Sequence, residues 1–192
     1  MNHRKYIIKN RRYRGIDMDL TMLVAIADND VIGFQGKIPW HLTTDMKRFK
    51  RLTMGKCVIV GRRTFESLPK LSGRRLFVVT SDINNISKPT SNIDAAFFNT
   101  PEKAVLSAFA TSRIMGSGEI IVAGGKTIYE ALEPYITKAI VTMVRSSPLG
   151  DTVYSLSIKN SAWWVWNTIE RGDPVVDNDT ESKVVVGRRM WV

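Results

Sequence analysis

The sequence predicts an α/β fold with a central mixed, mostly parallel sheet and an antiparallel hairpin at its C-terminal edge. In the first two thirds of the chain, short apolar runs alternate with segments of helical periodicity, which is typical of parallel strands joined by crossover helices. After Ile136 only strand-like segments follow. The last two, 163–169 and 183–192, flank an acidic, turn-rich stretch at Asp173–Asp179, which predicts a long hairpin.

Cap signals and apolar spacing place the individual elements. Thr100-Pro101-Glu102 opens a helix, because threonine is a good N-cap and proline fits the first helical position. An earlier amphipathic helix runs from about Thr44 to Thr53, with Thr43 or Thr44 as its N-cap. Two short helices are expected to end at Leu68 and Leu132. The remaining strands are expected at 20–27, 57–60, 76–79, 95–98, 120–123, 139–144 and near 153–154.

Composition indicates one metal-independent globular domain. Hydrophobic residues make up 44% of the 192 positions and charged residues 24%, an ordinary balance for a packed core. No apolar run is long enough to cross a bilayer, and no signal peptide is evident, so no membrane association is expected. The single cysteine, Cys57, excludes a disulfide framework and fits a cytoplasmic location. Two histidines without paired cysteines do not favour a structural zinc site.

The positive net charge is unevenly distributed. Of the formal +10, half lies in residues 1–18, a basic N-terminal extension that we expect to be flexible, ahead of one domain at 19–192. Three interpretations stay open: a solvated terminus, an arm that binds nucleic acid or another acidic surface, and a transit peptide. The body of the protein keeps about half of the excess charge, which suits an anionic ligand.

Two strand-to-helix junctions have the composition of phosphate sites. At Gly61-Arg62-Arg63-Thr64 a glycine ends a buried strand, and two arginines meet a helix N-terminus. At Ala123-Gly124-Gly125-Lys126-Thr127 paired glycines allow a ligand to approach the backbone. Such junctions are where an open α/β sheet binds a nucleotide, although a glycine at a strand end is most often explained by turn geometry alone. A P-loop is excluded, because it needs glycine where Ile120 stands.

Asp45 follows a stiff aromatic turn, Pro39-Trp40-His41, and lies in the first turn of the predicted helix. Met46, Phe49 and Leu52 recur there at helical spacing. In isolation, a carboxylate at this place is explained by the helix dipole.

Taken in order, these segments resemble the dihydrofolate reductase family over roughly residues 20–192. The resemblance implies about eight strands and about four helices. It also implies NADPH-dependent reduction of 7,8-dihydrofolate to tetrahydrofolate by hydride transfer with assisted protonation of N5. Thr43 departs from a frequent proline, Arg63 is a variable position, and residues 1–18 are not part of the family core. The segments that carry the resemblance are 31–33, 39–42, Asp45 with Phe49, 60–68, Gly73-Arg74, 123–129, Thr142 and Gly150-Asp151-Thr152.

The resemblance also implies roles for particular residues. Asp45 anchors the pterin ring and promotes protonation through a water, Thr142 hydrogen-bonds and orients Asp45, and Trp40 packs near the ring junction in a loop, 28–42, that closes over the nicotinamide. Arg74 pairs with the glutamate α-carboxylate. The other substrate contacts are Leu23, Val24, Met46, Phe49, Leu68, Leu71, Ala123 and Tyr129. The cofactor contacts are Ala25, Ile32, Gly61, Arg62, Arg63, Thr64, Thr80, Ser81, Gly124, Gly125, Lys126, Thr127 and Ile128, with Arg62, Arg63 and Ser81 on the 2′-phosphate that distinguishes NADPH from NADH.

Two other functions stay open. A pyrimidine or pterin reductase of the riboflavin pathway type shares the fold, but the combination of Trp40, Asp45 and Phe49 favours a folate-shaped ligand. A nucleic-acid or assembly module would act through the basic extension. We expect a monomer, because no obvious association element is present.

Overall fold

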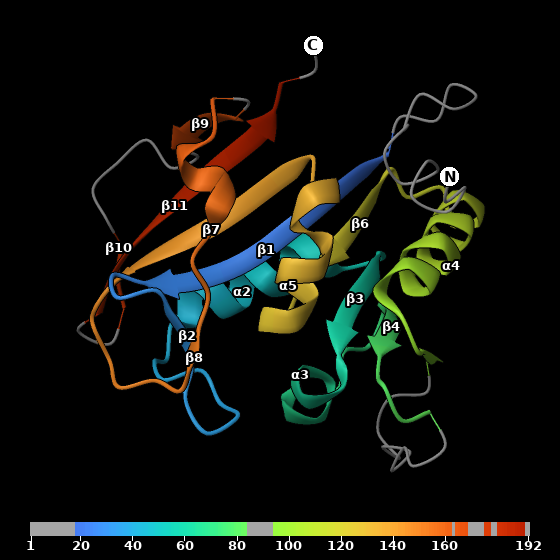
Figure 1. Ribbon diagram of the computed structural model, residues 1–192, viewed down its shortest axis with the longest axis horizontal. Coiled ribbons are helices and arrows are strands. Elements are labelled where there is room, and N and C mark those ends of the chain that lie inside the picture. Colours follow the sequence, from blue (N-terminus) through green and yellow to red (C-terminus); the bar gives the residue numbers. More distant parts are fainter. Residues whose placement is uncertain (1–17, 84–93, 163, 169–174, 178–179, 191–192) are drawn as a thin grey trace.

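The structure is a computed structural model that describes residues 18–83, 94–162, 164–168, 175–177 and 180–190. Within these ranges nine strands form the central sheet, in the spatial order β10-β11-β7-β1-β6-β3-β4-β5, with β9 beside β11 (Figure 1). The strands of this sheet are β1 (Asp19–Ala27), β3 (Cys57–Gly61), β4 (Arg75–Val79), β5 (Ala95–Phe98), β6 (Glu119–Val122), β7 (Lys138–Arg145), β9 (Trp164–Thr168), β10 (Val175–Asp177) and β11 (Thr180–Arg189).

The sheet is parallel from β5 to β7 and antiparallel beyond β7, as the sequence predicted. Strand β11 lies antiparallel to β7, and both β9 and β10 pair antiparallel with its other edge. The predicted hairpin between the last two strands is therefore present. Its turn-rich stretch nevertheless contains strand β10, which the sequence had suggested to be only a turn.

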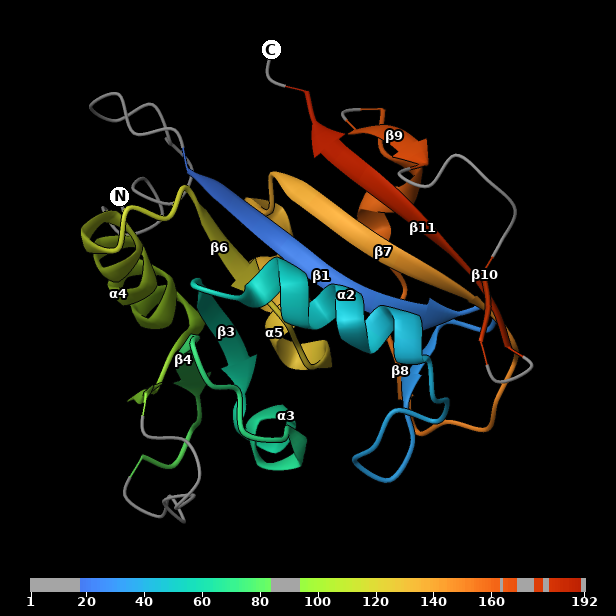
Figure 2. The ribbon, with the colours of Figure 1, turned by 180° about the vertical axis from the view of Figure 1, so that it is seen from behind.

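Helices cover both faces of the sheet. Helices α2 (Thr43–Thr53) and α3 (Arg62–Ser67) pack on the face shown in Figure 2, against Leu23, Val58 and Ile121. Helices α4 (Pro101–Ile114) and α5 (Lys126–Leu132) pack on the opposite face, against Met22 and Ile59. Because both faces are covered, the central strands are apolar along their whole length. The smaller elements are β2 (Val31–Gly33) and β8 (Thr152–Val153), which pair with each other, and the 3₁₀ helices η1 (Glu133–Tyr135) and η2 (Ser157–Asn160).

The two predicted helix caps have different outcomes. The side chain of Thr100 accepts a hydrogen bond from the backbone N–H of Lys103 at 3.3 Å, so the cap of α4 is confirmed. The predicted threonine cap of α2 is wrong, because this helix begins at Thr43 after Leu42 and has no side-chain cap. Among the described helices, none is both long and apolar enough to cross a membrane.

One carboxylate joins the amino ends of four neighbouring strands. Glu119, at the start of β6, accepts hydrogen bonds from Thr21 of β1 at 2.5 Å and from Lys138 of β7 at 2.9 Å. It also pairs with Lys56, which directly precedes β3. The Glu119 side chain is only 15% exposed, and burial alone would raise its pKa. The hydrogen bonds from Lys138, Lys56 and Thr21 outweigh burial and lower the pKa from 4.5 to about 2.

We expect Glu119→Gln to lower the free energy of unfolding at pH 7 by about 3 kcal/mol. Since the folded-state pKa of Glu119 lies below the unfolded value, its contribution is complete above about pH 4.5 and is lost as the pH falls through about 2. Denaturant unfolding of the wild type should therefore show a decline in stability over this pH range that the variant lacks.

Glu130→Gln is the matched control, because Glu130 forms an exposed pair with Lys126 at 3.8 Å. It should change the free energy of unfolding by less than about 0.5 kcal/mol. Equal stability of wild type and Glu119→Gln at pH 7 would contradict the role given to this cluster.

Candidate active site

The carboxyl half of β1 has no partner on its β6 side. The β1–β6 ladder ends at the pair Met22–Val122, whereas pairing of β1 with β7 continues to Ala27. Strand β6 ends at Val122, so its pairing with β1 stops at Met22, and Leu23, Val24 and Ala25 border this split in the sheet. The chain order also reverses here, since β3, β4 and β5 lie beyond β6 while β7 and β11 lie on the other side of β1. A split at such a place is the usual ligand site of an open α/β sheet.

Asp45 lies in the first turn of α2, on the face of the sheet that carries Thr142. The Thr142 hydroxyl donates a hydrogen bond to Asp45 Oδ1 at 2.6 Å, so the predicted contact between these residues is confirmed. Arg48 Nη1 lies 3.2 Å from the same oxygen. The Asp45 side chain is 26% exposed, so its carboxylate is accessible to a ligand.

Tyr129 of α5 is buried beside the split. Its hydroxyl donates to the carbonyl oxygen of Leu23 at 2.9 Å, just beyond the last β1–β6 pair. Its ring stacks on Tyr154 with centroids 5.2 Å apart. Burial, and to a smaller extent the negative charge of Asp45, raise the pKa of Tyr129. The phenol is therefore a permanent donor at neutral pH.

The two predicted phosphate junctions are adjacent in space. The Gly61 N–H donates to the Gly124 carbonyl at 2.7 Å, which links the end of β3 to the segment after β6. Gly124 has φ +97°, and a Cβ at this residue would lie 2.8 Å from the Tyr129 ring. A Cβ on Gly125 would lie 3.1 Å from Thr64 Oγ1. No side chain other than hydrogen therefore fits at Gly124 without displacing the tyrosine.

The other predicted cofactor residues differ in exposure. Arg62 and Arg63 are exposed at the start of α3, and Arg62 pairs with Glu66 at 2.7 Å. Thr80 is buried at the end of β4, whereas Ser81 after it is exposed. The remaining residues of this set include exposed Lys126 and Thr127, buried Ile128, and half-buried Ala25 and Ile32.

Most of the predicted substrate residues share one apolar cluster. Phe49 of α2, Leu68 after α3 and Ala123 after β6 are partly buried against a core that includes Leu23 and Leu71. Met46 is different, since it is 56% exposed and does not pack in the hydrophobic core beneath α2, as its helical spacing suggested. Val24 lies in the core of the opposite face, and Trp40, which was predicted to pack near the ring junction, is half-buried.

Arg74 is a buried arginine with spare donor capacity. It is 7% exposed, and its Nη1 lies 3.4 Å from Thr53 Oγ1. Its Nε–H has no hydrogen-bond partner within the described part of the chain. Burial lowers the pKa of the guanidinium, and an anionic ligand would compensate that desolvation.

The loop between β2 and α2 is held at its stem. Strand β2 pairs with β8, and the Asp151 carboxylate accepts hydrogen bonds from the backbone N–H of Gln35 at 2.7 Å and from the Thr152 hydroxyl at 2.9 Å. These hydrogen bonds lower the pKa of Asp151. The sequence singled out Gly150-Asp151-Thr152 only as a point of resemblance. Asp151 lies over a hundred residues from Gln35, so no local pattern predicted this contact.

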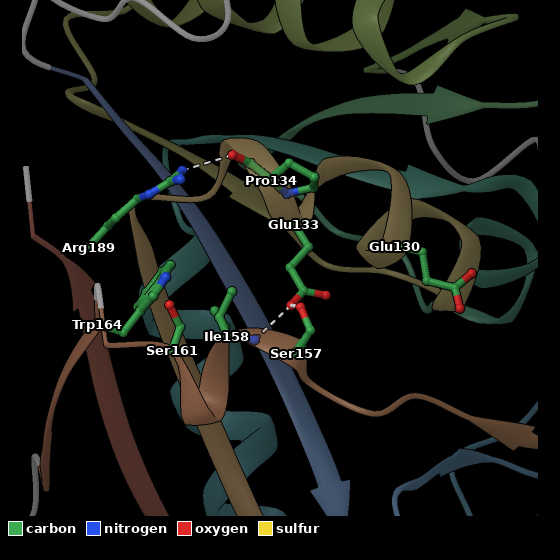
Figure 3. A pocket seen from close by; sticks show the side chains of 8 residues that line it. All are labelled: Glu130, Glu133, Pro134, Ser157, Ile158, Ser161, Trp164 and Arg189. Atoms are coloured by element: carbon green, nitrogen blue, oxygen red, sulfur yellow. Dashed lines mark hydrogen bonds between the residues drawn. The ribbon is translucent and has the colours of Figure 1, made fainter.

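A pocket of about 200 Å³ lies away from Asp45, on the face covered by α5 (Figure 3). The buried Glu133 carboxylate borders it and accepts hydrogen bonds from Tyr154 at 2.6 Å, from the Ile158 N–H at 2.9 Å and from the Ser157 hydroxyl. Since Ser157 and Ile158 begin η2, these bonds cap that helix and account for the buried charge. In the described residues no group of acidic, histidine or cysteine side chains could hold a metal ion.

A family model described as "Dihydrofolate reductase" matches residues 19–189. The chain belongs to the dihydrofolate reductase family. Dihydrofolate reductases are oxidoreductases, so this chain is assigned to that class of enzyme. Its fold and the geometry of its site agree with the assignment.

Curated relatives support the same family. The chain is 36% identical over 163 residues to "Dihydrofolate reductase type 9" of Escherichia coli, covering 84% of this chain and 88% of the relative. It is 34% identical to "Dihydrofolate reductase HdrB" of Haloferax volcanii over 68% of each chain. It is 32% identical to "Dihydrofolate reductase" of Staphylococcus aureus over 71% of this chain and 78% of the relative.

We expect Gly124→Ala to lower the free energy of unfolding by about 2–4 kcal/mol, because the new Cβ clashes with Tyr129 and the positive φ is strained. Thermal unfolding measures this loss. The matched control is Gly118→Ala, since a Cβ there meets nothing within 4 Å. Equal melting temperatures for the two variants would refute the close packing of Gly124.

Proposed function

We propose that the protein reduces 7,8-dihydrofolate to 5,6,7,8-tetrahydrofolate with NADPH, by hydride transfer with assisted protonation of N5. The observation that carries the proposal is the Asp45 carboxylate, held by Thr142 at 2.6 Å beside the split between β1 and β6, in a chain of this family.

A pterin ring presents a ring N–H and an amino group side by side, and one carboxylate accepts both. Asp45 is this acceptor. It fixes the ring in the cleft and assists protonation of N5 through a water rather than by direct contact. Thr142 keeps the carboxylate oriented, since this residue is buried in β7, with 1% of its surface exposed, and has little freedom to move.

The remainder of the substrate follows the apolar cluster away from Asp45. Phe49, Leu68 and Leu71, with buried Leu23 and exposed Met46, contact the pterin and the p-aminobenzoyl group, whereas Val24 packs in the core of the opposite face. Arg74 binds the glutamate α-carboxylate, for which its unpartnered Nε–H is available. A planar guanidinium suits a carboxylate better than a lysine would.

The residues of the glycine junctions fit a dinucleotide. The backbone at Gly124 and Gly125 packs closely against Tyr129 and Thr64, and the first N–H groups of α5 lack the i−4 partner that later turns have. Gly61, Thr64 and Lys126–Ile128 complete the pyrophosphate contacts, while Arg62, Arg63, Thr80 and Ser81 surround the adenosine 2′-phosphate. Ala25, Ile32 and Tyr129 border the nicotinamide. When bound, NADPH supplies the hydride that reaches the carbon next to N5.

The loop at 28–42 excludes water from the reacting atoms, with Trp40 near the ring junction. We further propose that residues 1–18 form an extension separate from the reductase domain at 19–192. No observation in the described residues favours the riboflavin-pathway or nucleic-acid alternatives, and the extension lies outside those residues except for Met18. The expected monomer and cytoplasmic location stay predictions.

Asp45→Asn should lower kcat/KM for dihydrofolate at pH 7 by about 10²–10⁴-fold, because the variant loses the group that assists protonation. At low pH the rate should recover in part, since the substrate is then protonated by solvent. NADPH oxidation measures both effects. Exposed Asp94→Asn, at the far edge strand, should keep the wild-type rate. Unchanged activity in Asp45→Asn would contradict the catalytic role assigned to Asp45.

Arg62→Ala should weaken binding of NADPH by about tenfold or more while changing binding of NADH little, because only NADPH carries the 2′-phosphate. Titration of both cofactors by fluorescence distinguishes the two effects. Arg113→Ala, an exposed arginine in the last turn of α4, should affect neither. Equal losses for both cofactors would move the 2′-phosphate contact elsewhere.

A further inference from the structure

Arg48 is a buried cation next to the proposed catalytic carboxylate. Its side chain is 9% exposed, and Nη1 lies 3.2 Å from Asp45 Oδ1, one helical turn away in α2. The other basic residues of this helix, Lys47, Lys50 and Arg51, are all exposed. Removing a guanidinium from water is costly unless it is paired. The burial of Arg48 alone among these four residues therefore indicates a specific interaction with the site.

The two contacts to Asp45 come from different elements. Thr142 approaches Oδ1 from β7 and Arg48 approaches it from α2. Both contacts are to Oδ1, so of the roughly four acceptor positions of a carboxylate the two on Oδ2 remain for the N–H donors of a pterin edge. Contacts from a strand and from a helix also resist rotation of the carboxylate.

We propose that Arg48 is a positioning residue that holds the Asp45 carboxylate correctly oriented for substrate binding, an inference that rests on the proposed function. Arg48 acts through Asp45 and not by touching the substrate. Its loss should therefore weaken recognition of the pterin more than it slows the steps after binding, and it should not affect the cofactor.

Arg48→Met tests this, because methionine keeps an unbranched side chain and removes the charge. We expect KM for dihydrofolate to rise about tenfold, with kcat within about threefold of wild type and KM for NADPH changed less than about twofold. Arg48→Lys restores the cation and should bring KM for dihydrofolate back to within about threefold of wild type. Arg51→Met, an exposed arginine of the same helix, is the control and should behave as wild type.

Each outcome decides the matter. If wild type does not oxidise NADPH with dihydrofolate, the proposed function fails and the role of Arg48 fails with it. If wild type is active and Arg48→Met has the KM of Arg51→Met, only the positioning role is overturned. If Arg48→Met does not fold, Arg48→Lys and Arg48→Gln are compared by KM and by denaturant unfolding. A loss of stability in Arg48→Gln without a rise in KM shows a purely structural arginine and overturns the proposal.

Discussion

The arrangement of the sheet depends on the hydrogen bonds and ion pairs of the Glu119 carboxylate. It bonds to groups at the amino ends of β1, β3 and β7 from its own place on β6, and these four strands are consecutive in the sheet. In a parallel sheet the amino ends of all strands lie at the same edge. Contacts that join these ends therefore set the lateral order of the strands and their register at that edge. The carboxyl ends are then free to diverge, and the separation of β1 from β6 after Met22 occurs at that opposite end.

The cleft is assembled from segments that are distant in the sequence. Asp45 comes from α2, Thr142 from β7 almost a hundred residues later, and Tyr129 from α5 reaches back to Leu23 of β1. None of these contacts is local, so the site forms only when the sheet does. In the sequence alone, the position of Asp45 is explained by the helix dipole. In the folded chain, its neighbours give the same carboxylate a specific chemical role.

Much of the fold was predictable, because apolar runs, glycines and the Thr100-Pro101 cap act over a few residues. The Asp45–Thr142 contact was predictable only through the family resemblance. Local patterns failed at α2, where a tertiary setting replaces a side-chain cap, and at Met46, whose helical spacing does not reveal which side faces the sheet. The partners of Arg48 and Glu133 were not foreseen either. Burial of a charge depends on neighbours that the sequence brings together only through folding.

The clasp between β2 and β8 limits how the loop over the cleft can move. Val31–Gly33 pairs with β8, and the Gln35 N–H is hydrogen-bonded to Asp151. The stem of the loop is therefore attached to the segment that follows β7. In the proposed closure of this loop over the cleft, the chain bends beyond Gln35, in the stretch that ends with Trp40. Since β7 also carries Thr142, the hinge of the loop and the support of the Asp45 carboxylate rest on one continuous piece of backbone. Changes at Asp151 would thus alter the rate of loop opening without touching any bound molecule.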